Sequence, residues 1–226
     1  ADRILADMGA IEAVANAGFL KKGGATFVWG ADRSPWSLRF FEAGRFRPDP
    51  SGIYSHTWHV ERARYDQLLL ETAQSHGVEV LQPGRVIDVA RDESGRVLGA
   101  TVRDGEGATH EISARYVVDA GGRNGPVARR IGKRIYDAVL RNVGVYGYWK
   151  GAELEARYSL DWDLSLISVI AIPIGWIWYI PVRRGVISVG VVTSHETYAA
   201  RGESLEAFYL EHLRTSPEVK RWLEHA

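Results

Sequence analysis

The sequence contains no cysteine and only one methionine among its 226 residues. The absence of cysteine excludes disulfides, thiolate zinc sites, iron–sulfur clusters and a cysteine nucleophile. The chain also has no excess of charge, because 28 basic residues balance 28 acidic ones. This balance indicates neither a nucleic-acid surface nor a polybasic membrane patch. A chain without cysteine fits a reducing compartment, so we expect a cytoplasmic protein.

Several motifs of known chemistry are absent as well. The seven histidines show no HExxH spacing, and no GxSxG nucleophile elbow occurs, so we expect no metal site and no serine hydrolase. No GxGxxG follows a first strand, which excludes a complete dinucleotide site in the chain as given. No signal peptide opens the chain. The first residue is alanine rather than methionine, and we interpret the sequence as a piece of a longer protein.

One long uncharged stretch, residues 164–182, approaches the length of a membrane-spanning helix. Pro173, Gly175 and Pro181 interrupt it, and β-branched and aromatic residues dominate it. This composition favours paired strands over a lipid-embedded helix. We therefore expect a buried β-hairpin and no membrane partner.

Apolar periodicity predicts a mixture of helices and strands. The helices are expected over residues 4–15, 61–76, 205–213 and 217–223, with a further short helix from Pro126. The strands are expected over residues 25–29, 38–41, 57–60, 78–81, 85–90, 97–102, 110–112, 115–119, 143–148, 166–172, 176–182 and 186–193, with a loop over 47–52. This order predicts an α/β (α+β) fold whose last strands form one antiparallel sheet.

Three segments are candidates for chemistry, each with a structural alternative. The strand–glycine–helix element at residues 117–125 could border a nucleotide or be a plain turn. Trp176 and Trp178 would share one strand face and could wall a flavin or aromatic substrate, although periodicity alone favours a sheet core. In the Lys21-Lys22-Gly23-Gly24 segment, a lysine next to the buried strands could be an amine with a lowered pKa, or it could be a solvated loop residue.

Four segments together resemble flavin-dependent halogenases, which are related to the p-hydroxybenzoate-hydroxylase-like FAD monooxygenases. Residues 18–30 resemble the family's KK-x-x-ATF-x-WG segment, and residues 60–70 resemble its V-x-R-x-x-F/Y-D-x-LL helix start. Residues 117–122 resemble its VIDA-G/S-G strand and turn. Residues 176–181 match its W-x-W-x-I-P signature, which is the most specific of the four.

The resemblance implies roles for individual residues. Lys22 aligns with the lysine that the family places between flavin and substrate, and Trp176 and Trp178 would line the tunnel between them. The cofactor-binding positions that the resemblance implies are His59, Val86, Asp119 and Gly121. His59 departs from the glutamine usual in the family. The 173–175 turn also departs from the acidic turn expected before the first tryptophan.

The resemblance also implies a division of the chain into domains. Residues 1–20 and 54–135 would form part of an FAD-binding domain, and residues 21–53 and 136–226 the substrate-side sheet and helices. The N-terminal GxGxxG unit and the later Gly-Asp segment of the family are not in this sequence. We therefore expect this chain alone to bind FAD weakly and to be inactive.

The function that the resemblance implies is halogenation of an electron-rich aromatic ring in secondary metabolism, such as antibiotic biosynthesis. Chloride or bromide would be oxidised with reduced FAD supplied by a separate flavin reductase, and Lys22 would hold the resulting hypohalous acid. The substrate would be phenolic or pyrrolic, possibly tethered to a carrier protein. Two alternatives stay open: an FAD-dependent hydroxylase or reductase on the same scaffold, and a non-catalytic fragment.

Overall fold

The computed structural model describes residues 2–40, 56–122, 125–132, 135–137, 139–155, 158–159 and 162–226. The chain forms two compact units, one from residues 1–73 and 140–226 and the other from residues 74–139. These boundaries differ from the predicted division, because residues 1–20 and 56–73 pack in the same unit as the large sheet. The predicted loop at 47–52 and Phe41, the last residue of the predicted second strand, lie outside the described residues.

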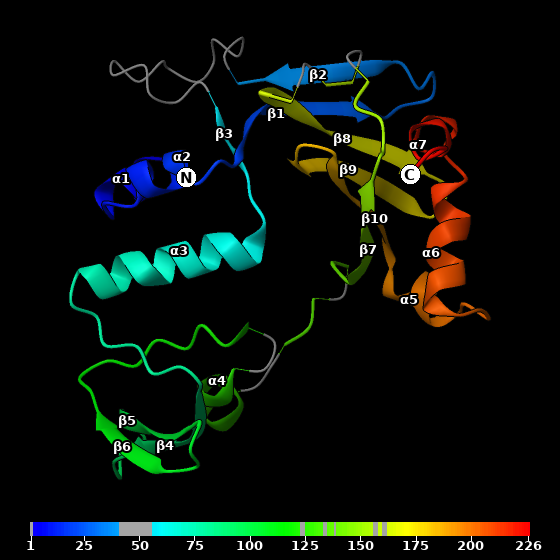
Figure 1. Cartoon of the computed structure of the whole chain (residues 1–226). Coiled ribbons are helices and arrows are strands. Elements are labelled where there is room, and N and C mark those ends of the chain that lie inside the picture. The colour runs from blue at the N-terminus through cyan, green and yellow to red at the C-terminus, as the bar shows by residue number, and fades with distance from the viewer. Residues whose placement is uncertain are drawn as a thin grey trace. The chain divides into compact units, whose positions relative to one another are not determined.

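The first unit is built on a seven-stranded sheet (Figure 1). Its strands are β1 (Leu20–Val28), β2 (Pro35–Arg39), β3 (Thr57–His59), β7 (Asn142–Lys150), β8 (Leu164–Ile172), β9 (Gly175–Arg183) and β10 (Val186–Ser194). Their order is β2-β1-β8-β9-β10-β7, and β3 also pairs with β1. The predicted antiparallel sheet is thus present from β8 to β7, but β1 joins it through a parallel pairing with β8. The uncharged stretch at 164–182 is the β8–β9 hairpin, as predicted.

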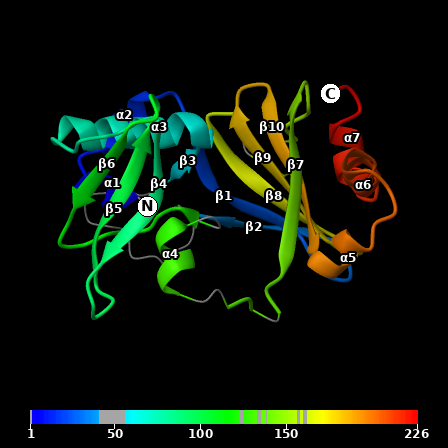
Figure 2. The ribbon, with the colours of Figure 1, turned by 90° about the horizontal axis from the view of Figure 1, so that it is seen from below.

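Three C-terminal helices cover one face of this sheet (Figure 2). They are α5 (His195–Ala199), α6 (Leu205–Leu213) and α7 (Pro217–Trp222). Ser216 caps α7 by accepting a hydrogen bond from Val219 N at 3.2 Å, as the Ser-Pro sequence predicts. Phe208 and Trp222 bury nearly their whole side chains against the sheet. The main hydrophobic core therefore lies between these helices and one sheet face.

Three helices lie near the start of the first unit. The apolar pattern predicted one helix over residues 4–15, but the structure has α1 (Asp2–Asp7) and α2 (Ile11–Asn16). Gly9 separates them with a φ of +71°, a conformation that ends a helix. The predicted helix at 61–76 is α3 (Arg62–Ser75). Its Tyr65, Leu68 and Leu69 pack against a small core formed by Leu5, Ala10 and Val14.

The second unit contains a three-stranded antiparallel sheet of β4 (Gly84–Arg91), β5 (Val97–Asp104) and β6 (Thr109–Ser113), with helix α4 (Pro126–Ile131). These strands match the two predicted hairpins. Residues 78–81 and 115–119 are irregular, so the two strands predicted there were wrong. The 115–119 segment has apolar residues but no pairing partner among the described strands, and Tyr116 and Val118 stay exposed. No helix in the described residues is both long and apolar enough to cross a membrane.

Candidate functional site

A β-bulge in β1 determines where Lys22 points. Lys22 pairs with Ser165 on β8, whereas Gly24, two residues later, pairs with the next residue, Leu166. The extra residue shifts the alternation of side chains. In the conformation of Gly24, with a φ of +154°, an added Cβ would lie 2.0 Å from the carbonyl oxygen of Leu38. Only glycine fits there, so the Gly23-Gly24 pair allows the bulge.

The bulge brings Lys22 to the same sheet face as a group of aromatic side chains. Through the β1–β8–β9 register, Lys22 and Ser165 share a face with Phe27, Val169 and Trp178. The strand pairs on either side extend this face to Trp36 and Tyr146. We call it the aromatic face, and its rings are those of Phe27, Trp29, Trp36, Tyr146, Tyr148, Trp176 and Trp178. It is the face opposite the one that packs against α6 and α7.

The aromatic face is only partly buried. Trp36 is 53% exposed and stacks on Phe27 with ring centroids 4.5 Å apart. Tyr146 and Tyr148 are 58% and 59% exposed. An exposed cluster of large rings is unusual for a surface that only meets water. The arrangement suits binding of a flat, apolar ring system.

Trp176 and Trp178 lie on one face, as their spacing predicts, but not in the helix-packed core. Both are half-buried, whereas Ile177 and Tyr179 between and after them face the core. Periodicity alone favoured the core, and that interpretation is corrected here. The two indoles also have different neighbours, since Trp176 lies 6.3 Å from the Trp29 ring and Trp178 lies 5.9 Å from that of Tyr146.

Glycines make room for the Trp178 indole. A Cβ on Gly190 would lie 2.2 Å from the Trp178 ring, and one on Gly144 would lie 3.3 Å from it. The indole therefore lies across β10 and β7 where those strands carry no side chain. Its Nε1 donates a hydrogen bond to Ser188 Oγ at 3.3 Å, which fixes the direction of the ring.

Lys22 is half-buried on strand β1 between β3 and β8. The sequence placed it in a loop before the strand, and the structure corrects this. Burial lowers the pKa of its ammonium group below the ordinary value of 10.5, because removing water disfavours the charged form. Lys21 pairs with Trp58 and therefore points to the opposite face. Of the two adjacent lysines, only Lys22 is directed to the aromatic face.

His59 and Ser165 lie beside Lys22 and are almost fully buried. His59 is 3% exposed, and its Nε2 lies 3.4 Å from the carbonyl oxygen of Ser165. Burial, together with a smaller effect of the neighbouring Lys22 charge, lowers the pKa of His59 to about 4. The imidazole is therefore neutral near pH 7. Its small exposed surface leaves little area for contact with a cofactor.

Val86, a predicted cofactor contact, lies in the second unit. It is a half-buried residue of β4 and lines a cavity of about 850 Å³. The cavity is basic, with four arginines in its wall: Arg85, Arg103, Arg129 and Arg130. Arg85 and Arg103 are directly opposite each other on β4 and β5, and Arg130 pairs with Asp88. Such a concentration of positive charge suits an anionic ligand.

Asp119 and Gly121 form a self-contained turn in the second unit. The Asp119 carboxylate accepts hydrogen bonds from Gly121 N and from Ala128 N in α4, both at 2.9 Å. These bonds hold the pKa of Asp119 below its usual range. A Cβ on Gly125 would lie 2.6 Å from the carboxylate, so the glycine is needed for this close approach. These two bonds fix the orientation of the carboxylate against the turn and the first turn of α4.

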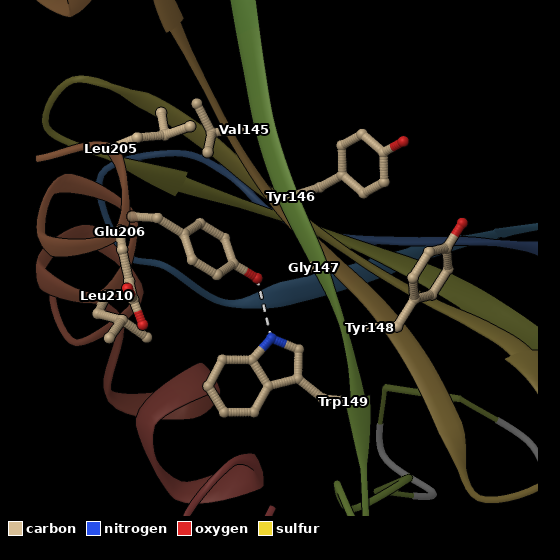
Figure 3. Close-up of a pocket in the computed structure, with 9 residues that line it drawn as sticks. Val145, Tyr146, Gly147, Tyr148, Trp149, Leu205, Glu206 and Leu210 are labelled. Atoms are coloured by element: carbon tan, nitrogen blue, oxygen red, sulfur yellow. Dashed lines mark hydrogen bonds between the residues drawn. The ribbon is translucent and has the colours of Figure 1, made fainter.

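A second cavity, of about 500 Å³, lies between β7 and α6 (Figure 3). Trp149 Nε1 donates to the Tyr209 hydroxyl at 2.9 Å, and this hydroxyl donates to the Val189 carbonyl oxygen at 2.8 Å. Tyr146 and Tyr148 project to the other side of β7. The polar groups of Trp149 and Tyr209 are thus already hydrogen-bonded to each other and to the backbone. We therefore regard the aromatic face, which includes Lys22, as the better candidate for a reactive site.

The structure brings Lys22, His59, Trp176 and Trp178 together in the first unit, whereas Val86, Asp119 and Gly121 belong to the second. Within the described residues, no group of three His, Asp or Glu side chains could hold a metal ion. The sequence reasoning missed Ser165 and the other rings of the aromatic face. The alternation of Phe27 with Trp29, and of Tyr146 with Tyr148, could have indicated those rings, but no pattern singles out Ser165.

The chain is similar to known proteins over nearly its whole length. A family model described as tryptophan halogenase matches residues 19–221. The tryptophan 2-halogenase of Chondromyces crocatus is 34% identical over 219 residues, which cover 93% of this chain and 38% of that protein. A 1H-pyrrole-2-carbonyl-[peptidyl-carrier protein] chlorinase of Pseudomonas fluorescens is 30% identical over 225 residues, covering 94% of this chain and 49% of the relative.

A solved structure has the same fold. The myxobacterial chondrochloren halogenase CndH, an FAD-dependent halogenase, superposes with a TM-score of 0.85 at 34% identity. The match covers 97% of this chain and 48% of that one. This chain therefore spans about half or less of the length of the proteins that it matches.

Proposed function

Because the chain belongs to the tryptophan halogenase family, we propose that its full-length protein is a flavin-dependent halogenase acting on an electron-rich aromatic substrate. The membership confirms the resemblance seen in the sequence motifs. The observation that carries the proposal is the bulge in β1, which directs the half-buried Lys22 to the sheet face that also presents Trp176 and Trp178. A reactive amine and a surface for flat rings thus share one face.

In this proposal the Lys22 amine holds the oxidised halogen. Burial lowers the pKa of Lys22, which makes the neutral amine more accessible near pH 7. The amine can hydrogen-bond hypohalous acid or react with it. In the reaction, the N–halogen bond forms, the halogen–oxygen bond breaks, and the amine proton leaves with the hydroxyl group as water. The substrate ring then forms a bond to the halogen as the N–halogen bond breaks. The ring proton is transferred to the lysine nitrogen, which regenerates the amine.

The aromatic face supports the choice of substrate class. Its half-exposed rings would stack with a planar substrate and exclude water from the space beside Lys22. Exclusion of water matters because it protects a reactive halogen species from side reactions. A phenolic or pyrrolic ring, free or attached to a carrier protein, fits these requirements.

The second unit has residues that fit part of FAD. The arginine-lined cavity next to Val86 suits the anionic end of a dinucleotide. The backbone of the Asp119–Gly121 turn would border the cofactor. When bound and reduced by a separate flavin reductase, FAD supplies the oxidation of chloride or bromide by dioxygen.

The test uses the full-length protein with FAD, a flavin reductase, chloride or bromide, and a panel of tryptophan, a phenol and a carrier-bound pyrrole. Mass spectrometry would detect halide-dependent product, while absorbance follows flavin reoxidation. Lys22→Ala is expected to abolish product without stopping reoxidation, since oxidation of the flavin belongs to the cofactor. Lys22→Arg should fail too, because guanidinium has no free amine.

Lys21→Ala is the matched control, because Lys21 is exposed and faces away from the aromatic face. It should form product at close to the wild-type rate. Halogenated product from Lys22→Ala at the wild-type rate would contradict the role of Lys22. Hydroxylated product would favour the hydroxylase alternative, and absence of flavin turnover in all variants would favour a non-catalytic protein.

A further inference from the structure

The hydroxyl of Ser165 is the unexplained polar group next to Lys22. Ser165 is 0% exposed, and its Oγ has no hydrogen-bond partner among the described residues. Buried hydroxyl groups are nearly always paired, because an unpaired one loses its bonds to water without replacement. We therefore expect Ser165 Oγ to form a hydrogen bond that the side-chain positions of the described residues do not show.

The strand register identifies that partner. Ser165 and Lys22 are directly paired positions on the adjacent parallel strands β8 and β1, so their side chains leave the sheet on the same face. Neighbouring strands lie about 5 Å apart, which is well within the reach of a lysine side chain that folds back over the sheet. The amine of Lys22 has three donors and no competing ion pair in the described residues.

The other described side chains next to Ser165, those of His59 and Thr57, make their hydrogen bonds to other atoms than Ser165 Oγ. His59 approaches Ser165 from β3, but its Nε2 lies against the backbone carbonyl oxygen rather than Oγ. On the other side of Lys22, Thr57 donates a hydrogen bond to Asp2 at 3.2 Å. Of the three described side chains that the strand register places beside Ser165, the Lys22 amine is the donor for which no hydrogen bond is recorded.

We propose that Ser165 is a positioning residue, whose Oγ accepts a hydrogen bond from the Lys22 amine and directs that amine toward the aromatic face. The bond restrains the long lysine side chain, which otherwise samples many rotamers. Its effect on halogenation rests on the proposed function above, whereas the bond itself does not.

The first test measures the Lys22 pKa in the full-length protein, by competitive acetylation across pH with peptide mass spectrometry. A Lys21→Arg background removes the neighbouring lysine signal. Because a hydrogen bond to the charged form is the stronger one, Ser165→Ala should lower the Lys22 pKa by about one unit. Ser165→Thr keeps the hydroxyl and should restore it. Ser168→Ala, a buried serine on the core-facing side of β8, controls for loss of a serine in this strand.

The second test measures halogenated product per flavin reoxidised. Ser165→Ala should lower this ratio about tenfold at every pH, since misdirection of the amine is not repaired by deprotonation. Ser165→Thr should rescue it. An unchanged Lys22 pKa in Ser165→Ala, or a Ser165→Thr variant that behaves like Ser165→Ala, overturns the proposal. A shifted pKa together with product from Lys22→Ala would keep the hydrogen bond and reject only the halogenase role of Lys22.

Discussion

Lys22 and Phe27 lie on the same face of the sheet, although five positions separate them in one strand. The bulge at Gly23-Gly24 causes this, since it adds one residue to β1 relative to β8. Regular alternation would direct Lys22 to the core-facing side, where a charged amine would be costly to bury. The glycine pair is therefore part of the proposed site, although neither glycine has a side chain to offer.

Gly24→Ala should destabilise the first unit by about 2–3 kcal/mol. The added Cβ would lie 2.0 Å from the Leu38 carbonyl oxygen, and the φ of +154° disfavours any side chain. Urea unfolding of the full-length protein would measure the change. Gly202→Ala, whose Cβ would meet nothing within 4 Å, is the control and should change stability by less than about 0.5 kcal/mol. Equal stability of the two variants would argue against the bulge.

Gly190→Ala should displace the Trp178 indole. Its Cβ would lie 2.2 Å from a ring atom, a separation that the rigid indole can relieve only by moving. We expect a changed near-ultraviolet circular dichroism spectrum and reduced halogenation. Gly147→Ala on β7 meets Tyr209 at an ordinary 3.4 Å and should leave the spectrum close to that of the wild type.

Tryptophans on the two sheet faces should respond differently to truncation. Trp222 is 1% exposed, packs on Tyr158 and Tyr179, and donates to Glu155 at 2.8 Å. Trp222→Ala should cost about 3–5 kcal/mol of unfolding free energy. Trp176→Ala removes a half-buried ring. It should lower the free energy of unfolding less than Trp222→Ala does, but it should reduce the yield of halogenated product more. Paired unfolding and turnover measurements would test this, and a reversed order would contradict the assignment of the two faces.

His59 should make stability depend on pH. Burial lowers its pKa to about 4 from an ordinary 6.5, so the unfolded chain binds more protons between these values. Stability should therefore fall as pH decreases from about 6.5 to 4, by about 3 kcal/mol at most from this residue. Denaturant unfolding across this pH range should show a weaker dependence in His59→Gln than in the wild type. Identical slopes would indicate that His59 is not buried in the neutral form.

Much of the secondary structure follows from local pattern. The alternating apolar runs of β8, β9 and β10 and the Ser216-Pro217 start of α7 were predicted close to their observed bounds. These predictions are correct because burial of one strand face and capping of a helix end both depend on residues that are close together in the sequence. The prediction of a strand at 115–119 was wrong because a strand must form hydrogen bonds with a neighbouring strand. The apolar residues of this segment do not reveal whether such a neighbour exists.

The sequence by itself determined the family, through the motifs around Lys22 and the Trp176–Trp178 pair, and the mixed α/β composition of the fold. Only the tertiary structure decided which face of the sheet each of these residues occupies. Alternation along one strand says which side chains share a face, but not which face the C-terminal helices will cover. The bulge that turns Lys22 away from the core, and the pairing of Lys22 with the buried Ser165, arise from the register between β1 and β8. That register joins residues more than 140 positions apart, and no local pattern contains it.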